Sequence, residues 1–238
     1  MKKFLSLALV LVMVLSVAAL VGCSGDKAPS GDDAATLKFG LGVVSSYGEA
    51  KDADGETNGA GEFNTTAVAV LLDAEGKIAA IDLDTAQIKT AWTSAGKNIA
   101  VEDLRTKYEK GTDYGMAAYG KKHDGSEGKA LEWNEQADAF MATAKGKTVA
   151  EVKALMAEDG YATGDLATAG CTIHVTDFIG ALEKAVASAA DSKATANDKL
   201  SVALVAAEST AEAAAFSRPA TKSVTWIVQP AVARSPVA

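Results

Sequence analysis

The most constraining feature of the sequence is a pair of strand-like segments joined by a short turn. Residues 65–73 are rich in β-branched and apolar side chains, and residues 78–84 return with apolar side chains at Ile81 and Leu83. Between them, residues 73–77 read Asp-Ala-Glu-Gly-Lys, a combination that favours a hairpin turn. This unit predicts two adjacent antiparallel strands, so the core must form at least in part on an antiparallel sheet.

Further strands and several helices are expected around this hairpin. Residues 37–47 and 87–92 have the apolar character of strands, and residues 114–128, with repeated glycines, are expected to be irregular. Helices are predicted at four places: 101–110, 132–141, from Thr148 through Leu155 behind a capping box with Glu151, and 176–187 with Thr176 as N-cap. The chain is therefore predicted to be α+β, an antiparallel β-sheet with hairpins packed by several amphipathic helices.

The N-terminus resembles the signal peptide of a bacterial lipoprotein. A basic start is followed by the apolar residues 4–20, and the run closes with Leu20-Val21-Gly22-Cys23. A transmembrane helix is the alternative, but the run is short for one and ends at a small-residue cleavage site. We expect residues 1–22 to be a signal peptide and Cys23 to carry a lipid. Residues 23–36 would then be a flexible tether, with the protein held at the extracytoplasmic face of the cell membrane.

The rest of the chain divides by composition into a domain and a tail. We expect residues 37–193 to form the α+β domain. Residues 199–205 can be laid over residues 38–44, which predicts the first strand of a second copy within residues 194–238. The copy does not continue, because the chain after Glu212 loses its acidic residues and becomes richer in proline. A truncated repeat is expected there, with a tail of low order in which residues 223–228 could pair as an edge strand.

Charge and residue types exclude several functional classes. A net charge of −8 and a pI of about 4.9 argue against a nucleic-acid partner. The only two histidines, His123 and His174, are not grouped with cysteines or carboxylates at metal-ligand spacing, and no known enzyme motif is present. With Cys23 lipidated, Cys171 is left as the free thiol, and we expect it to be a small buried residue.

The turn Ala169-Gly170-Cys171-Thr172 precedes a predicted helix, where backbone N–H groups can receive a phosphate. Together with Ile173 and the apolar helix face that follows, it resembles the flavin-attachment segment of the bacterial FMN-binding domain family. Gly170 matches the motif glycine, Thr172 the acceptor and Ala169 the small position. The sequence departs from the pattern at Cys171, where the family has alanine, and in the spacing of Asp165. His174 also replaces a hydroxyl residue.

The resemblance implies a cofactor and a role. In this family a flavin transferase esterifies the acceptor hydroxyl with the phosphate of FMN, so the implied attachment site is Thr172. Candidates for an apolar wall beside the isoalloxazine ring are Trp133, Tyr114, Tyr119 and Met116. The implied function is an electron carrier that serves a redox protein partner and turns over no substrate of its own.

The sequence allows alternatives for the flavin and for the function. Flavin could be bound without a covalent bond, or the domain could have lost it. A cofactor-free binding or structural surface lipoprotein with a degenerate repeat is the alternative function. A solute-binding protein is disfavoured because the chain is short for two lobes.

Overall fold

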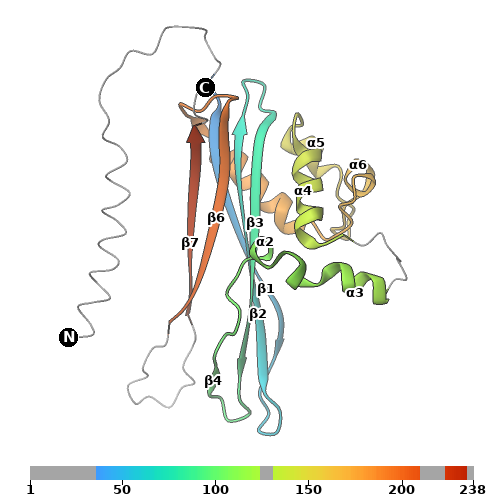
Figure 1. Cartoon of the computed structure of the whole chain (residues 1–238), viewed down its shortest axis with the longest axis vertical. Coiled ribbons are helices and arrows are strands. Elements are labelled where there is room, and N and C mark those ends of the chain that lie inside the picture. Colours follow the sequence, from blue (N-terminus) through green and yellow to red (C-terminus); the bar gives the residue numbers. More distant parts are fainter. Residues whose placement is uncertain (1–35, 124–130, 210–222, 235–238) are drawn as a thin grey trace, which may run out of the picture. The chain divides into compact units, whose positions relative to one another are not determined.

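The computed structural model describes residues 36–123, 131–209 and 223–234 of the chain. Its centre is a five-stranded antiparallel sheet with the strand order β4-β3-β2-β1-β5 (Figure 1). The predicted α+β fold, with hairpins in an antiparallel sheet and several helices packed on it, is confirmed. The strands are β1 (Lys38–Lys51), β2 (Gly59–Leu72), β3 (Ile78–Trp92), β4 (Asn98–Ile99) and β5 (Ala190–Asp191).

The hairpin turn between β2 and β3 lies where the sequence predicts it. The Asp73 N–H donates to the Lys77 carbonyl (2.9 Å), and the Lys77 N–H donates to the Asp73 carboxylate (2.8 Å). Gly76 adopts a φ of +75°, which glycine reaches without steric cost. Strand β3 is longer than expected, because the two strands predicted at 78–84 and 87–92 are one continuous strand.

One face of the sheet is covered by helices (Figure 1). Helix α7 packs against β1 and β2, and α4 packs against β3. The helical elements are α2 (Lys107–Lys110), η1 (Gly111–Tyr114), α3 (Met116–His123), α4 (Trp133–Ala144), α5 (Val149–Lys153), α6 (Gly164–Thr168) and α7 (Thr176–Ala187). None of the helices in the described part of the chain is long and apolar enough to cross a membrane.

The opposite face of the sheet is covered by a second, two-stranded sheet. Strand β6 (Asp198–Ser209) pairs with β7 (Ser223–Arg234) and packs against β3 and β2 (Figure 1). In β2, Val68 belongs to the core under the helices, whereas Ala67 packs with Leu204 of β6. Burial on both faces explains why the apolar run of β2 does not alternate with polar residues.

Strand β6 is the strand expected from the overlay of residues 199–205 on 38–44, and the predicted pairing of residues 223–228 lies within β7. The backbone N–H of Val202 donates to the Asp82 carboxylate at 2.7 Å, which fixes β6 across the first sheet. The assignment of residues 194–238 to a truncated repeat stays a prediction. Strand β6 itself covers apolar residues on the second face of the first sheet, such as Ala67 and Ala86.

The close approach of α7 to β1 depends on two glycines. A Cβ atom on Gly40 would lie 2.0 Å from the Ala185 carbonyl oxygen, and one on Gly42 would lie 2.0 Å from the Ala181 carbonyl oxygen. Only a strand residue without a side chain allows a helix backbone to lie this close. The small residues Ala181 and Ala185 complete the fit from the helix side, and both are fully buried.

Helix α7 also hydrogen-bonds the backbone of β1. The Ser188 hydroxyl donates to the Leu41 carbonyl (2.9 Å) and accepts from the Leu41 N–H (3.1 Å), and the Lys184 ammonium donates to the Val43 carbonyl (2.9 Å). Beyond its short pairing with β5, β1 has no further strand partner on this side among the described residues. Side chains in α7 and at its C-cap therefore form hydrogen bonds with β1 backbone groups that would lack a partner at the edge of the sheet.

Three local predictions were wrong. The helix predicted at 101–110 spans only Lys107–Lys110, because Thr106 forms a capping box with Glu109 and starts the helix there. The segment expected to be irregular contains η1 and α3. Thr176 is the first residue of α7, whose N-cap is Val175, because the Val175 N–H donates to the Gly160 carbonyl and its carbonyl already accepts from Ile179.

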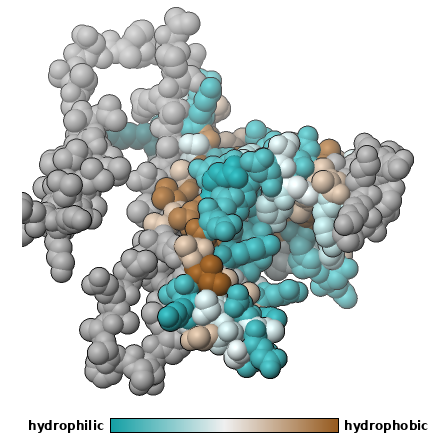
Figure 2. All heavy atoms as spheres, turned by 60° about the horizontal axis from the view of Figure 1, so that its bottom comes forward, coloured by the Kyte–Doolittle hydropathy of each residue, from teal (hydrophilic) through white to brown (hydrophobic). Residues whose placement is uncertain are grey.

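The predicted signal peptide, Cys23 and residues 24–35 of the predicted tether lie outside the described residues, as do residues 124–130, 210–222 and 235–238. On the face of the described residues seen in Figure 2, the surface is mostly hydrophilic, with a narrow band of apolar residues. A polar surface of this kind agrees with the net charge of −8.

The contact between α7 and β1 gives a stability prediction. Replacing Gly42 with Ala forces the helix away from the strand, and we expect the free energy of unfolding to fall by about 1–3 kcal/mol. Gly180→Ala is the matched control, because its Cβ would meet only Val44 at an ordinary 3.4 Å inside a helix. Urea denaturation measures both. Equal stability of Gly42→Ala and the unsubstituted protein would contradict the close approach.

A buried carboxylate on β3 makes stability depend on pH. Asp84 is 8 % exposed, and its side chain accepts hydrogen bonds from the backbone N–H groups of Thr85 (2.6 Å) and Tyr108 (3.3 Å). Burial nevertheless outweighs these bonds and raises the pKa of Asp84 to about 6. The folded state therefore holds this proton more tightly than the unfolded chain does.

We expect the stabilising contribution of protonated Asp84 to be complete below about pH 4 and lost as the pH rises through 6. The loss is on the order of 2–3 kcal/mol, at about 1.4 kcal/mol for each pKa unit. Asp84→Asn should remove this part of the pH dependence, measured by urea denaturation at pH 4.5 and 7.5. Asn replacement of the exposed Asp52 is the control. A pH profile unchanged by Asp84→Asn would count against a raised pKa.

Candidate functional site

The segment that resembles a flavin-attachment motif is a turn between α6 and α7. Ala169 ends α6 and is exposed, and Gly170 follows with a φ of +102°. This backbone conformation favours glycine, and a Cβ atom here would also lie 2.7 Å from Leu131 Cδ1, so the Leu131 side chain would have to shift. Thr172 then emerges at the surface, with its side chain exposed.

The Thr172 hydroxyl is held by a buried amide. The Oε1 atom of Gln136, on α4, accepts from both the N–H (2.9 Å) and the hydroxyl (3.2 Å) of Thr172. The Gln136 amide in turn donates to the Leu131 carbonyl (3.1 Å) and to the Met116 sulfur (3.4 Å). Gln136 is only 5 % exposed, and its hydrogen bonds hold its side chain in one orientation. The Oε1 atom therefore holds the Thr172 hydroxyl in a defined position.

Cys171 is fully buried, as its small apolar side chain predicts. Its N–H donates to the Leu166 carbonyl at 3.0 Å, and burial raises the pKa of its thiol to about 11. The thiol is therefore protonated at neutral pH and is no nucleophile. Leu166 is also fully buried, and Asp165 points away from the turn toward Lys147, at 3.9 Å.

A cavity of about 590 Å³ opens where the packed face of the sheet ends. Under α7 this face is apolar, with Val68 on β2, but the next position along the same face is Thr66, whose hydroxyl shares a hydrogen bond with Thr85 (2.7 Å). The lining combines hydroxyls, amides, aromatic rings and charges: Ser46, Tyr47, Gly48, Asn64, Thr66, Thr85, Gln87, Lys107, Trp133, His174, Thr176, Asp177 and Phe178.

The aromatic base of this cavity is rigid. Trp133 is the first residue of α4, where a capping box between Glu132 and Glu135 fixes the start of the helix. Its ring packs edge to face against Phe178, with 5.7 Å between the ring centroids, and both residues are almost completely buried. The cavity therefore has an apolar base whose position is set by the core of the domain.

Lys107 is the cation of the cavity. Its ammonium lies over the rings of Tyr114 (5.0 Å to the centroid) and Trp133 (5.3 Å). Burial lowers the pKa of Lys107 to about 8, and the negative charges of Glu62 and Asp177 oppose this shift. On α7, Asp177 is the anion of the cavity, and it accepts a hydrogen bond from the Ser46 hydroxyl at 2.9 Å.

The structure brings some of the predicted residues together and separates others. Trp133 and His174 line the cavity, whereas Ala169, Gly170, Cys171 and Thr172 do not. The other wall candidates do not line this cavity: Tyr114 donates its hydroxyl to Gln87 (3.1 Å), Met116 contacts Gln136, and Tyr119 is 65 % exposed.

Even so, Thr172 lies close to the cavity. His174 follows it by two positions, which is no more than about 7 Å of extended backbone between their Cα atoms. Gln136 also lies only three residues after Trp133 in α4, about 4.5 Å along the helix axis. The hydroxyl is thus held beside the cavity by the same helix that forms its aromatic base.

The residues that sequence reasoning missed are Gln136 and Lys107. A signal for Gln136 was present, because it is the one amide on the helix face that carries Trp133, Ala137 and Phe140. Lys107 gave no signal, because it became part of the cavity only through the packing of α2 beside α4. The first turn of α7, near which backbone N–H groups could receive a phosphate, carries the negative charge of Asp177.

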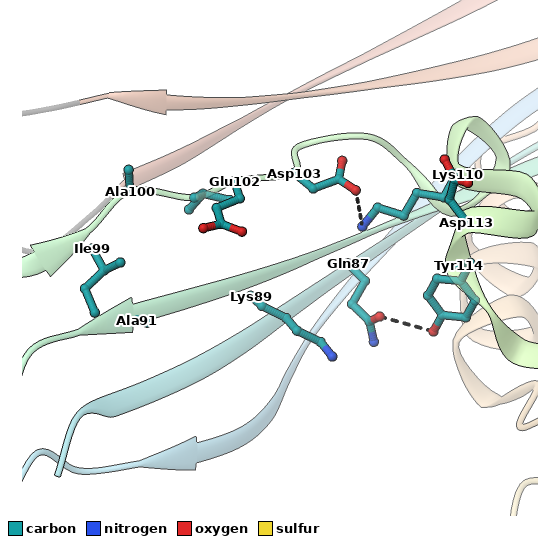
Figure 3. Close-up of a pocket in the computed structure, with 11 residues that line it drawn as sticks. Gln87, Lys89, Ala91, Ile99, Ala100, Glu102, Asp103, Lys110, Asp113 and Tyr114 are labelled. Carbon is teal, nitrogen blue, oxygen red and sulfur yellow. Dashed lines mark hydrogen bonds and ion pairs between the residues drawn. The ribbon is translucent and has the colours of Figure 1, made fainter. Parts of the chain in front are cut away.

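A second cavity, of about 460 Å³, lies on the other side of Gln87 (Figure 3). Its charged side chains are largely paired with one another: Lys110 lies 3.8 Å from Asp103, and Arg105 binds Asp103 and Asp113 at 3.1 and 2.9 Å. These pairs brace the segment that precedes α3. Across the described residues, no group of three or more histidine, cysteine, aspartate or glutamate side chains is placed to hold a metal ion.

Comparison of the chain with known protein families, with curated proteins and with solved structures finds no match.

Proposed function

We propose that this protein carries FMN on the Thr172 hydroxyl and relays electrons as a lipoprotein anchored through Cys23 at the extracytoplasmic face of the membrane. The observation that carries the proposal is the pairing of an exposed, oriented hydroxyl with an adjacent cavity. Gln136 orients the hydroxyl, and Trp133, on the same helix, forms the base of the cavity.

The residues present fit a flavin. The cavity volume of about 590 Å³ lies within the range of about 300–1,000 Å³ that is typical of small-molecule sites. An isoalloxazine ring has an apolar edge and a polar edge. The aromatic base suits the first, and the hydroxyls and amides of Thr66, Asn64 and Gln87 suit the second. The short distance from Thr172 to His174 lets a phosphate and sugar-alcohol chain reach from the hydroxyl to the cavity.

The chemistry supplied by bound FMN is reversible electron transfer, and the chain orients and tunes it. Attachment by a transferase would join the Thr172 Oγ1 atom to the phosphorus of the FMN half of a flavin dinucleotide donor. The bond from that phosphorus to the other half of the donor would break, the other half would leave as a mononucleotide, and the hydroxyl proton would pass to solvent. The Gln136 Oε1 atom accepts that proton in a hydrogen bond beforehand and so acts as a positioning group. The neutral, buried Cys171 thiol does not compete for the bond, which removes one objection raised by the departure from the family motif.

We expect co-expression with a flavin transferase to yield yellow protein with flavin absorbance and a mass gain on the peptide that contains Thr172. Thr172→Ala should abolish the mass gain. Thr168→Ala is the matched control, because that exposed hydroxyl lies four residues away and only donates to the Gly164 carbonyl. Absence of flavin from the unsubstituted protein would favour the cofactor-free binding lipoprotein. Flavin retained by Thr172→Ala would place the attachment elsewhere or make it non-covalent.

The role of Gln136 gives a separate prediction. Gln136→Met keeps the volume but removes the acceptor for the Thr172 hydroxyl, and we expect the rate of flavin attachment to fall at least about tenfold. Gln136→Glu retains an acceptor oxygen and should restore part of the rate. Thermal unfolding of each variant distinguishes a role of Gln136 in positioning the hydroxyl from a role in stability alone. A Gln136→Met protein that is less stable but is loaded at the normal rate would show that Gln136 is merely structural.

A further inference from the structure

Lys107 occupies an unusual position for a lysine. It is half-buried, it lines the cavity, and its ammonium lies over two aromatic rings. Among residues 36–119 and 131–207, whose side chains the structure describes, no carboxylate oxygen lies within 4.0 Å of this ammonium. The side chain thus presents a positive charge to the cavity, with neither an ion-pair partner nor full hydration.

The nearby charges do not neutralise Lys107. Glu62 accepts from the amides of Asn64 (2.9 Å) and Gln87 (2.7 Å), and Asp177 accepts from Ser46. These carboxylates raise the pKa of Lys107, but burial lowers it by more, and the positive charges of Lys110 and Lys89 lower it further. His174, a further titratable group of the lining, contacts the Thr176 hydroxyl (3.2 Å) and the Tyr161 ring.

We propose that Lys107 meets the negative charge that develops on a flavin ring in this cavity, and that it thereby raises the midpoint potential of the bound flavin. The inference rests on the proposed function. A redox partner supplies two electrons and the solvent supplies one proton, so reduction adds one unit of negative charge to the ring. A cation on the wall of a cavity that is partly shielded from water stabilises the reduced flavin, because that form carries the extra negative charge.

The same reasoning assigns the opposite effect to Asp177. Its carboxylate lines the cavity from the first turn of α7 and disfavours added negative charge. The two residues are therefore a matched pair of opposite sign on separate elements. Removing either charge tests whether charges on the cavity wall shift the potential of the flavin. Asp177→Asn provides this test even if a Lys107 variant fails to fold.

The experiment measures the midpoint potential of the flavin-loaded protein at pH 7 by titration with dithionite, followed by absorbance. We expect Lys107→Met to lower the ratio of reduced to oxidised flavin about tenfold at a given potential, which is a shift of about −30 mV for a two-electron couple. Asp177→Asn should shift the potential upward, and Lys107→Arg should keep it near that of the unsubstituted protein.

Lys110→Met is the control. It removes the same charge from the same helix, but Lys110 lines the second cavity and pairs with Asp103. We expect its shift to be less than a third of that of Lys107→Met. Circular dichroism confirms folding of each variant before titration.

The outcomes separate the two proposals. Absence of flavin from the unsubstituted protein overturns both. Normal loading with the same potential in Lys107→Met and the unsubstituted protein overturns only the role of Lys107. Equal shifts in Lys107→Met and Lys110→Met also overturn it, because they would show a general effect of net charge. Shifts of opposite sign for Lys107→Met and Asp177→Asn support the inference.

Discussion

The structure depends on the contact between α7 and β1. Gly40 and Gly42 let the helix backbone lie directly on the strand, and Ser188 and Lys184 satisfy backbone groups along the same strand. This contact fixes the position of the helix on the sheet, and therefore where Asp177 and Phe178 lie relative to β1, β2 and β3. A cavity lined by the start of one helix and by residues of three strands keeps its shape only if the helix cannot slide.

The cavity is a consequence of how the sheet changes character along its strands. On the helix face, apolar side chains of β2 and β3 give way to the paired hydroxyls of Thr66 and Thr85. Polar side chains at these positions do not support further helix packing, so the helical layer ends there and leaves a space with a polar floor. Trp133 and Phe178 close the core on one side of that boundary and form the base of the cavity on the other.

The candidate site also shows how a departure from a motif can be accommodated. Cys171 stands where the family that this turn resembles has alanine, but the thiol is buried and its raised pKa keeps it neutral, so it serves as a small apolar residue. Strand β6 also departs from the pattern expected for the domain, because it belongs to the segment after residue 193 but packs on the first sheet. Whatever its origin, it covers apolar residues of β2 and β3 that water would otherwise reach.

The sequence by itself determined the hairpin, the capping box at Thr148, the amphipathic helices and the α+β class, because these depend on residues close together in the chain. It did not determine the length of β3, which depends on pairing with β2 along its whole length. The start of the helix at Lys107 follows a local capping box of Thr106 and Glu109, and the Tyr108 N–H in its first turn donates to the distant Asp84 carboxylate. The sequence identified Thr172 and Trp133 separately. Only the tertiary structure joined them through Gln136 and placed Lys107 over Trp133, because hydrogen bonds and ring contacts between distant segments leave no periodic pattern in a sequence.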